Sequence, residues 1–285
     1  MRSGFLKAAL LLSSTVANGL SPPVSEGKHI ISRKPQDHGI EQHQVRDVKN
    51  RLSYIWNGGE VAGPRFESVT AEVVIPNITF PYGYNASASY SSSVWVGIGG
   101  DQNTCDDPAR VHNGGLILGG YYYMYNPQGD FGVFAFYEWF PDPPHFLDNE
   151  HGILTNIGDH VRMTVKQKDN TTGTFTWENL SQNIKFEKDL KAPANGTLCT
   201  NHAEWIIESF MTENDHETLF PDFGELTFTN VKAVSEGGKP ASLADGIIVT
   251  AEPELHSGKY LTSCEMVLPD ATTCKWLGYK GIFGY

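Results

Sequence analysis

The chain has 285 residues, of which 19% are charged and 12% aromatic, a composition typical of a globular protein rather than a disordered one. Its formal net charge is -12 at pH 7, and residues 52–285 contain 29 acidic against 13 basic residues. An acidic body of this kind lacks a basic patch for phosphates, which argues against nucleic acid and membranes as partners. It suits a protein that works in acid, where protonation of carboxylates relieves their mutual repulsion.

Residues 1–19 predict a secretory signal peptide. Arg2 and Lys7 precede a short apolar run that ends in small residues, and cleavage is expected near Ala17 or Gly19. No other apolar run approaches the length of a transmembrane helix. Five Asn-x-Ser/Thr sequons fit glycosylation in the secretory pathway; they begin at Asn77, Asn85, Asn170, Asn179 and Asn195. The sequence therefore predicts a soluble, monomeric glycoprotein that is secreted to the extracellular space.

Residues 20–51 have the character of a pro-segment or linker. They contain six basic residues but no sustained periodicity, so a short ordered arm is the weaker alternative. Their positive charge beside an acidic domain suggests that the pro-segment docks electrostatically, as a partner of its own domain. Such docking weakens as the carboxylates become protonated.

Residues 52–285 predict a single all-β domain. Short runs rich in β-branched and aromatic residues are separated by Gly, Pro and Asn, and no helical window exceeds two turns. About a dozen strands without alternating helices favour an antiparallel two-sheet β-sandwich. The expected strands are 68–75, 92–98, 115–125, 132–140, 160–167, 172–180, 183–187, 203–210, 223–230, 246–251 and 260–267.

Four cysteines in a secreted chain suggest two disulfides, for which three connectivities exist. Cys264 and Cys274 are close in sequence and would join a local hairpin, which leaves Cys105 to pair with Cys199. No Cys-x-x-Cys or His-Glu-x-x-His spacing occurs, so neither a metal nor a cofactor is expected.

The segment 198–210 carries the clearest candidate for acid/base chemistry. If it is a strand, its alternation groups His202, Glu204, Ile206 and Glu208 on one face and an apolar set around Trp205 on the other. Two carboxylates beside an imidazole can form a catalytic site. The competing interpretation is an ordinary polar face of a strand, since structural charge clusters outnumber catalytic ones.

Two further strands predict side chains that accompany this site. Alternation in 93–99 places Trp95 on one face, and alternation in 134–142 groups Phe134, Phe136 and Glu138. A lone carboxylate on an aromatic face is costly unless it lines a cleft or is paired, and its pKa should then be raised. The alternative is that Glu138 lies at the rim and reaches water.

Several motifs in order give the chain a family resemblance. They are Trp-Val-Gly-Ile at 95–98, Tyr-Glu-Trp-Phe-Pro-Asp at 137–142, Asn-His-Ala-Glu-Trp-Ile-Ile-Glu at 201–208 and Asp-Phe-Gly-Glu-Leu-Thr-Phe-Thr-Asn at 222–230. The chain resembles the eqolisins, the fungal glutamic peptidases. The resemblance implies a concanavalin-like β-sandwich that binds polypeptide on its concave face. It also implies that Glu204 is the general base and acid and that Glu138 supports it.

The chain departs from the family at the second catalytic residue. The family has a glutamine whose side-chain amide stabilises the oxyanion; here the strand reads Leu-Ile-Leu-Gly-Gly at 116–120, so the position falls on Gly119 or, one residue earlier, on Leu118. Neither side chain can donate a hydrogen bond, and losing one oxyanion donor costs on the order of 100- to 1000-fold in turnover. Substitutes are available in a longer loop and beyond it, namely Gln102, Asn103, His112, Asn113 and Gln128.

Three classes of function follow from these patterns. The first is a secreted glutamic-peptidase relative, either a weak or altered acid endopeptidase or, somewhat favoured by the missing donor, a non-catalytic polypeptide-binding protein. The second is a glycan-active or lectin-like sandwich that uses Glu138 and Glu204, whose separation would distinguish a retaining from an inverting pair. The third is a purely structural secreted protein without a cleft.

Overall fold

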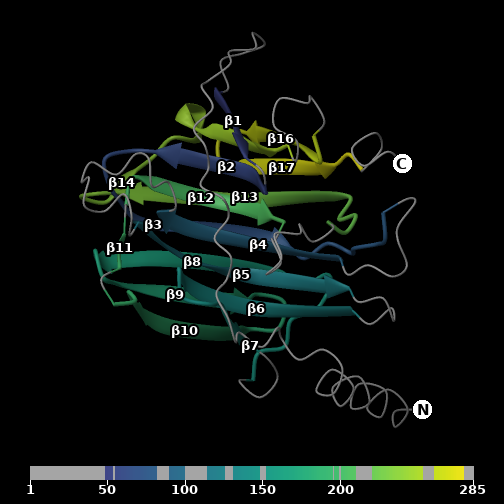
Figure 1. Ribbon diagram of the computed structural model, residues 1–285, viewed down its shortest axis with the longest axis horizontal. Helices are drawn as coiled ribbons and strands as arrows, with labels where there is room; N and C mark the ends of the chain where they lie inside the picture. The colour runs from purple at the N-terminus through teal and green to yellow at the C-terminus, as the bar shows by residue number, and fades with distance from the viewer. Residues whose placement is uncertain are drawn as a thin grey trace.

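The computed structural model describes residues 49–53, 55–81, 90–99, 114–125, 131–147, 152–194, 196–198, 200–209, 220–252 and 260–278. These residues form seventeen strands and one short 3-10 helix (Figure 1). The elements are β1 (Lys49–Ser53), β2 (Trp56–Ala62), β3 (Phe66–Val74), β4 (Tyr90–Gly99), β5 (Gly114–Tyr125), β6 (Phe131–Phe140), β7 (His145–Leu147), β8 (His160–Asp169), β9 (Thr172–Asn179), β10 (Ile184–Lys191), β11 (Thr197–Leu198), β12 (His202–Glu208), β13 (Glu225–Ser235), β14 (Lys239–Pro240), η3 (Leu243–Asp245), β15 (Ile247–Ala251), β16 (Thr262–Val267) and β17 (Ala271–Trp276).

The strands form two sheets, which confirms the predicted all-β sandwich. The first sheet has the order β1-β15-β2-β12-β4-β5-β6-β7, with β11 beside β5. The second has the order β10-β9-β8-β3-β13-β17-β16, with β14 beside β13. Neighbouring strands are antiparallel except β1 with β15 and β11 with β5. Strands that follow one another along the first sheet, such as β12, β4, β5 and β6, lie side by side in Figure 1.

The main core lies between the two sheets, where alternate residues of each strand point inward. On β12 these residues are Ala203, Trp205 and Ile207, all fully buried. Opposite them, the second sheet contributes Phe175 and Trp177 from β9. The expected alternation of the 203–209 segment is therefore present, and the face that carries Glu204 points away from this core.

Strands β1 and β2 begin the first sheet and were not predicted. The Trp-Asn-Gly-Gly-Glu run of β2 contains two adjacent glycines and no β-branched residue, so it lacks the usual strand signal. Its backbone nevertheless pairs with both β12 and β15. Strand β1 pairs with β15 along Lys49–Ser53. It crosses the predicted boundary between residues 51 and 52, so Arg51 lies in the same strand as the first residues assigned to the domain.

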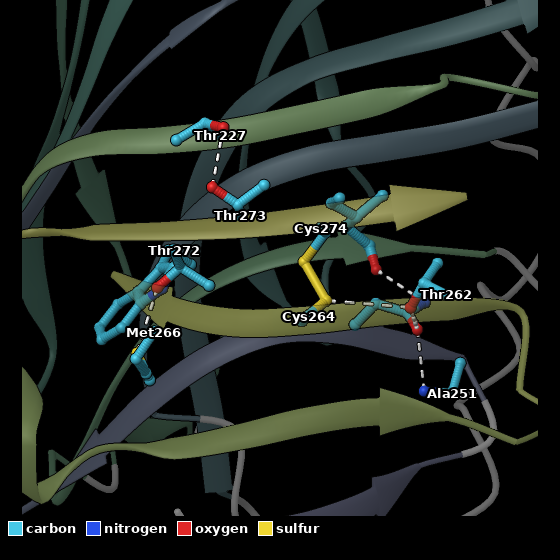
Figure 2. Close-up of a disulfide and its surroundings, with 11 residues drawn as sticks. Thr227, Ala251, Thr262, Cys264, Met266, Thr272, Thr273 and Cys274 are labelled. Atoms are coloured by element: carbon cyan, nitrogen blue, oxygen red, sulfur yellow. Dashed lines mark hydrogen bonds between the residues drawn. A yellow bond between two sulfur atoms is a disulfide. The ribbon is translucent and has the colours of Figure 1, made fainter. Parts of the chain in front are cut away.

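The disulfide between Cys264 and Cys274 links β16 to β17, with an S–S distance of 2.04 Å (Figure 2). The two residues face each other in the ladder, as expected for a local hairpin. Cys105 and Cys199 lie outside the described residues, as do residues 1–48 and the loop candidates Gln102, Asn103, His112, Asn113 and Gln128. No helix in the described ranges is long and apolar enough to cross a membrane.

The sequons differ in their surroundings. Asn77 is exposed and Asn170 is half-buried. Asn179 is only 1% exposed, and its amide donates to Asp159 at 2.7 Å. A glycan on this nitrogen would displace that buried contact, so the folded domain does not present Asn179 for modification. Asn85 and Asn195 fall outside the described ranges.

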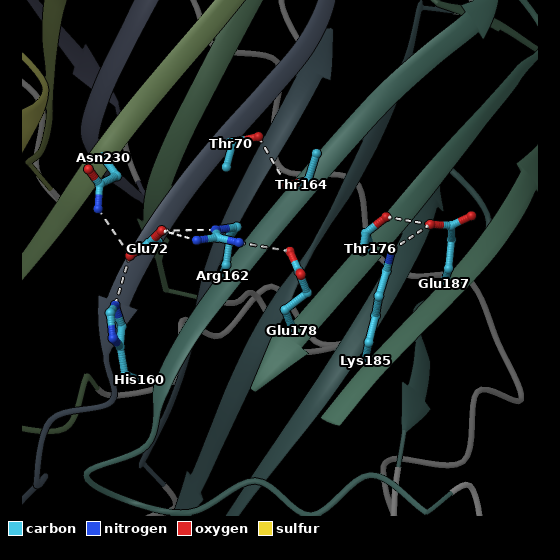
Figure 3. Close-up of polar contacts among 10 residues, drawn as sticks. All are labelled: Thr70, Glu72, His160, Arg162, Thr164, Thr176, Glu178, Lys185, Glu187 and Asn230. Atoms are coloured by element: carbon cyan, nitrogen blue, oxygen red, sulfur yellow. Dashed lines mark hydrogen bonds and ion pairs between the residues drawn. The ribbon is translucent and has the colours of Figure 1, made fainter. Parts of the chain in front are cut away.

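The outer face of the second sheet carries a polar network around Glu72 (Figure 3). Its carboxylate accepts hydrogen bonds from Arg162 at 2.8 Å and Asn230 at 3.0 Å, and His160 lies at 2.9 Å. Burial raises the pKa of Glu72, but the hydrogen bonds from Arg162 and Asn230 and the nearby positive charges outweigh it and leave the pKa lowered. Each carboxylate oxygen is satisfied, so we interpret this network as structural.

Candidate active site

The face of the first sheet that points away from the main core, here called the site face, carries its own apolar cluster. Its residues come from β2, β4, β5, β6, β12 and β15 and the segment before β2, so distant parts of the chain supply one surface. A face exposed only to water would not bury such side chains. The buried members are Ile55, Trp56, Trp95, Leu116, Leu118, Phe136, Ile206 and Val249.

A single row of paired residues crosses the site face. Glu204 on β12 pairs with Glu60 on β2 at one side and with Gly97 on β4 at the other. Gly97 pairs with Leu118 on β5, and Leu118 pairs with Glu138 on β6. Residues opposite each other in adjacent strands share a face. The row therefore places three carboxylates and one leucine in line across five strands.

Glu204 and Glu60 form the buried side of this row. Glu204 is 0% exposed, and its cross-strand neighbour Glu60 is 1% exposed. Arg51 binds Glu60 through two nitrogens: Nε donates to Oε1 at 3.1 Å, and Nη2 donates to Oε2. The same Nη2 is 4.0 Å from Glu204 Oε1. The guanidinium also stacks over Trp56, 5.8 Å from the ring centroid. Two buried carboxylates are thus held close by one shared cation.

Gly119 and Leu118, the two candidate positions of the family glutamine, lie on opposite faces of the first sheet. A Cβ on Gly119 would lie 2.4 Å from the ring of Phe175, which belongs to the main core. Leu118 belongs to the apolar cluster of the site face and is 4% exposed. The position that faces the same side as Glu204 is therefore Leu118, the alternative one residue before Gly119.

Gly97 separates Glu204 from Leu118. A Cβ at this position would lie 2.9 Å from both Leu116 and Trp95, closer than side chains normally approach. The strand therefore accommodates glycine but not a larger residue without movement of its neighbours. The side chains of Leu116 and Trp95 therefore occupy the space above Gly97, between the strands that carry Glu204 and Leu118.

Glu208 occupies the end of β12 on the same face. Trp95 Nε1 donates a hydrogen bond to its Oε2 at 2.8 Å. Burial raises the pKa of Glu208 to about 7, although hydrogen bonds to the charged form, including that from Trp95, act in the opposite direction. This carboxyl group is consequently protonated in acid.

Glu138 is half-buried on β6. Burial, together with the negative charges of Glu208 and Asp142, raises its pKa well above the usual range. The expectation of a raised pKa for this lone carboxylate agrees with that direction. Three strand spacings separate Glu138 from Glu204, so their Cα atoms are roughly 14 Å apart. That separation does not favour a glycosidase pair.

Comparison with known proteins places this geometry in a family. The sequence matches the Peptidase A4 family over residues 54–276. The chain belongs to that family. It is 30% identical to Aspergillopepsin-2 of Aspergillus niger over 213 residues, covering 70% of each chain, and 28% identical to Scytalidopepsin B of Scytalidium lignicola over 255 residues, covering 86% of this chain and 87% of the other.

Solved structures of eqolisins share the fold of this A4 family member. Scytalido-glutamic peptidase with a transition state analog inhibitor superposes with a TM-score of 0.63 at 26% identity, covering 79% of this chain and 99% of the other. Aspergilloglutamic peptidase from Aspergillus niger gives a TM-score of 0.55 at 30% identity, covering 66% and 99%. The resemblance that the sequence motifs indicated is therefore confirmed.

The remaining predicted site residues of this A4 family member surround the row. Phe136 is buried in the apolar cluster 6.3 Å from the ring of Phe146, while Phe134 is half-buried. His202 begins β12 and is 4% exposed, with its Nδ1 3.3 Å from the side chain of Asn201. Phe136 lies on the site face, as the alternation along β6 predicts for a regular strand.

Sequence reasoning missed Arg51 and Glu60, two charged residues beside Glu204. Arg51 fell in the predicted pro-segment, and Glu60 lay in a glycine-rich run without a strand signal. The sequence did contain one indication of a site here: Glu60 is the one charged residue in the stretch from Trp56 to Val61. Its pairing with Glu204 depends on the order β2-β12, which the sequence does not specify.

Proposed function

We propose that this chain is an acid endopeptidase in which Glu204 is the general base and then the general acid. The observation that carries the proposal is the position of Glu204: it is central in the first sheet, on the site face, within an A4 family chain. The carboxylate takes a proton from water as the oxygen attacks the peptide carbonyl. The protonated side chain then gives that proton to the amine as the C–N bond breaks.

The charge pattern of the site face supports activity in acid. The pKa values of Glu138 and Glu208 are raised, so both groups are neutral at low pH and add no repulsion near the site. A general base must remain ionised under those conditions. A cation, the guanidinium of Arg51, lies 4.0 Å from Glu204 Oε1.

The apolar cluster supports binding of polypeptide. Trp56, Leu118 and Phe136 are buried members of the apolar cluster on the site face, which also carries Glu204. Ligand sites are lined mainly by apolar and aromatic side chains, so this cluster supports binding of extended peptide segments with large apolar side chains. The proposal includes secretion, an extracellular monomeric glycoprotein and removal of a basic pro-segment that ends before β1. The disulfide of the β16–β17 hairpin is compatible with an oxidising compartment.

The test is cleavage of denatured protein and peptides by the purified protein at pH 3 to 4. Glu204→Gln should abolish cleavage because the amide cannot accept the proton from water. The matched control is Glu265→Gln, which makes the same chemical change at an exposed position on β16 of the other sheet. The control should cleave at the wild-type rate.

Peptide binding without cleavage by the wild-type protein would overturn the proposal and assign the chain to the non-catalytic branch. Cleavage that survives Glu204→Gln would also overturn it, because the base would then be another residue. Hydrolysis of β-glucans that depends on Glu138 and Glu204 would instead assign the glycan-active alternative.

A further inference from the structure

Glu204 belongs to a charged cluster whose other two members take no part in the proton transfers proposed for Glu204. It consists of Arg51 on β1, Glu60 on β2 and Glu204 on β12. Glu60 and Glu204 are buried, and the Arg51 side chain is 20% exposed. Burying like charges side by side is costly unless a cation compensates them. The cation is the partly exposed member of the cluster, and its Nη2 lies 4.0 Å from the Glu204 carboxylate that would activate the water.

We propose that Arg51 is the oxyanion-stabilising residue of this peptidase and takes the role of the side-chain amide that Leu118 cannot supply. This inference rests on the proposed peptidase function. Leu118 and Arg51 approach Glu204 from different sides, since Leu118 follows across β4 whereas Arg51 reaches over from the β2 side. The donor has therefore changed sides relative to the strand where the family resemblance places its glutamine.

The contacts of Arg51 hold its guanidinium in a fixed position. Its two hydrogen bonds to Glu60 form a planar, two-point pair, and Trp56 packs on the guanidinium. The backbone of β1 is held by a five-residue ladder to β15. A donor that is positioned before the reaction stabilises developing charge without reorganisation, which is the property required of an oxyanion site. Glu60 is then a positioning residue.

The chemistry balances with Arg51 in this role. Water attacks the carbonyl carbon, Glu204 receives one proton from that water, and the electron pair of the C=O bond moves to the oxygen. The cationic guanidinium donates hydrogen bonds to this oxyanion without losing a proton. When the C–O double bond re-forms, the C–N bond breaks and the amine takes the proton from Glu204. The products are a carboxylic acid and an amine.

This role has a consequence for processing of the chain. A mature protein that began at residue 52 would lack the first three residues of β1, including Arg51. Our proposal requires that the active form begins before residue 49, so that the pairing of β1 with β15 is retained. Sequencing the N-terminus of the active protein measures this directly.

The central experiment compares kcat and KM for Arg51→Met, Arg51→Lys and Arg162→Met at pH 3 to 4. Arg162 is the matched control because two of its nitrogens also contact a buried glutamate, Glu72, but on the second sheet. Arg51→Met should lower kcat by roughly 100- to 1000-fold, as expected for loss of an oxyanion donor, with a smaller change in KM. Arg51→Lys should recover part of kcat, and Arg162→Met should retain it.

Two variants keep the test valid if Arg51→Met leaves Glu60 as a buried, unpaired charge and the protein does not fold. Arg51→Met combined with Glu60→Gln removes both charges and should fold but cleave slowly. Arg51→Ala should regain kcat when guanidinium ion is added, and methylammonium of equal concentration should restore less. A merely structural role for Arg51 predicts no rescue of a folded variant by a small cation.

A folded Arg51 variant with an unchanged kcat would overturn the inference. An increased kcat would also overturn it, because Arg51 would then obstruct the site. An active form that begins after residue 51 would overturn it as well, because that form lacks Arg51. In these cases cleavage that still depends on Glu204 leaves the peptidase proposal intact. Absence of cleavage by the wild-type protein overturns both.

Discussion

Two neighbouring substitutions on β5 test which residue faces the candidate site. Leu118→Gln and Gly119→Gln add the same amide one residue apart, yet the structure directs them to opposite faces of the first sheet. The first should give a folded protein with an amide beside Glu204. The second should damage the main core and add nothing to the site.

The expected sizes follow from burial and space. Gly119→Gln places its Cβ 2.4 Å from the ring of Phe175, which is 0% exposed and cannot move aside. Overpacking of this kind costs about 1 to 3 kcal/mol, and burial of an unpaired amide adds about 1 to 3 kcal/mol. Leu118→Gln loses about 2 kcal/mol of apolar burial, but a hydrogen bond to a charged group returns about 1.5 to 3 kcal/mol.

Urea denaturation measures the stability difference, and peptide cleavage at pH 3 to 4 measures the site. We expect Leu118→Gln to unfold within about 2 kcal/mol of the wild type and Gly119→Gln to be destabilised by several kcal/mol. Leu118→Gln should also partly restore kcat in the Arg51→Met background, because it offers a second donor. A stable Gly119→Gln protein with increased activity would refute the assignment of faces.

Three further outcomes are expected. Burial raises the pKa of Glu208 to about 7, so the folded state keeps a proton that the unfolded state releases near pH 4.5. The free energy of unfolding should therefore fall by up to about 3 kcal/mol as the pH rises between these two values. Glu208→Gln should remove this pH-dependent component, which urea titrations at several pH values would measure. Because the pKa of Glu72 is lowered, its contribution is present above the unfolded value and lost as pH falls through the folded one, so Glu72→Gln should reduce the loss of stability in acid. Glycopeptide mapping of the secreted protein should find glycan at exposed Asn77 and none at buried Asn179.

Different results would contradict each argument. A Glu208→Gln protein with the wild-type pH dependence would mean that Glu208 is not protonated in the folded state. An unchanged acid transition for Glu72→Gln would mean that the network around it does not favour the charged form. A quantitative glycan at Asn179 would show that its contact with Asp159 is not needed for the fold.

The sequence by itself determined the fold class, the family and the local facing of side chains. Alternation along regular strands separated Glu204 and Glu208 from Trp205, because successive residues of a strand point to opposite faces. Short motifs identified the family because several occur in a fixed order. Strands with strong β-branched and aromatic signals, such as β4, β5, β8 and β9, were predicted close to their observed bounds.

The tertiary structure decided which strands are neighbours and, through that, which charges meet. Glu60 and Glu204 are 144 residues apart in sequence but pair directly where β2 joins β12. Arg51 reaches both of them from β1. No local pattern encodes such contacts, since strand order depends on long-range pairing and on packing of both sheets. The position that replaces the family glutamine likewise required the structure, because a shift of one residue exchanges Gly119 in the core for Leu118 on the site face.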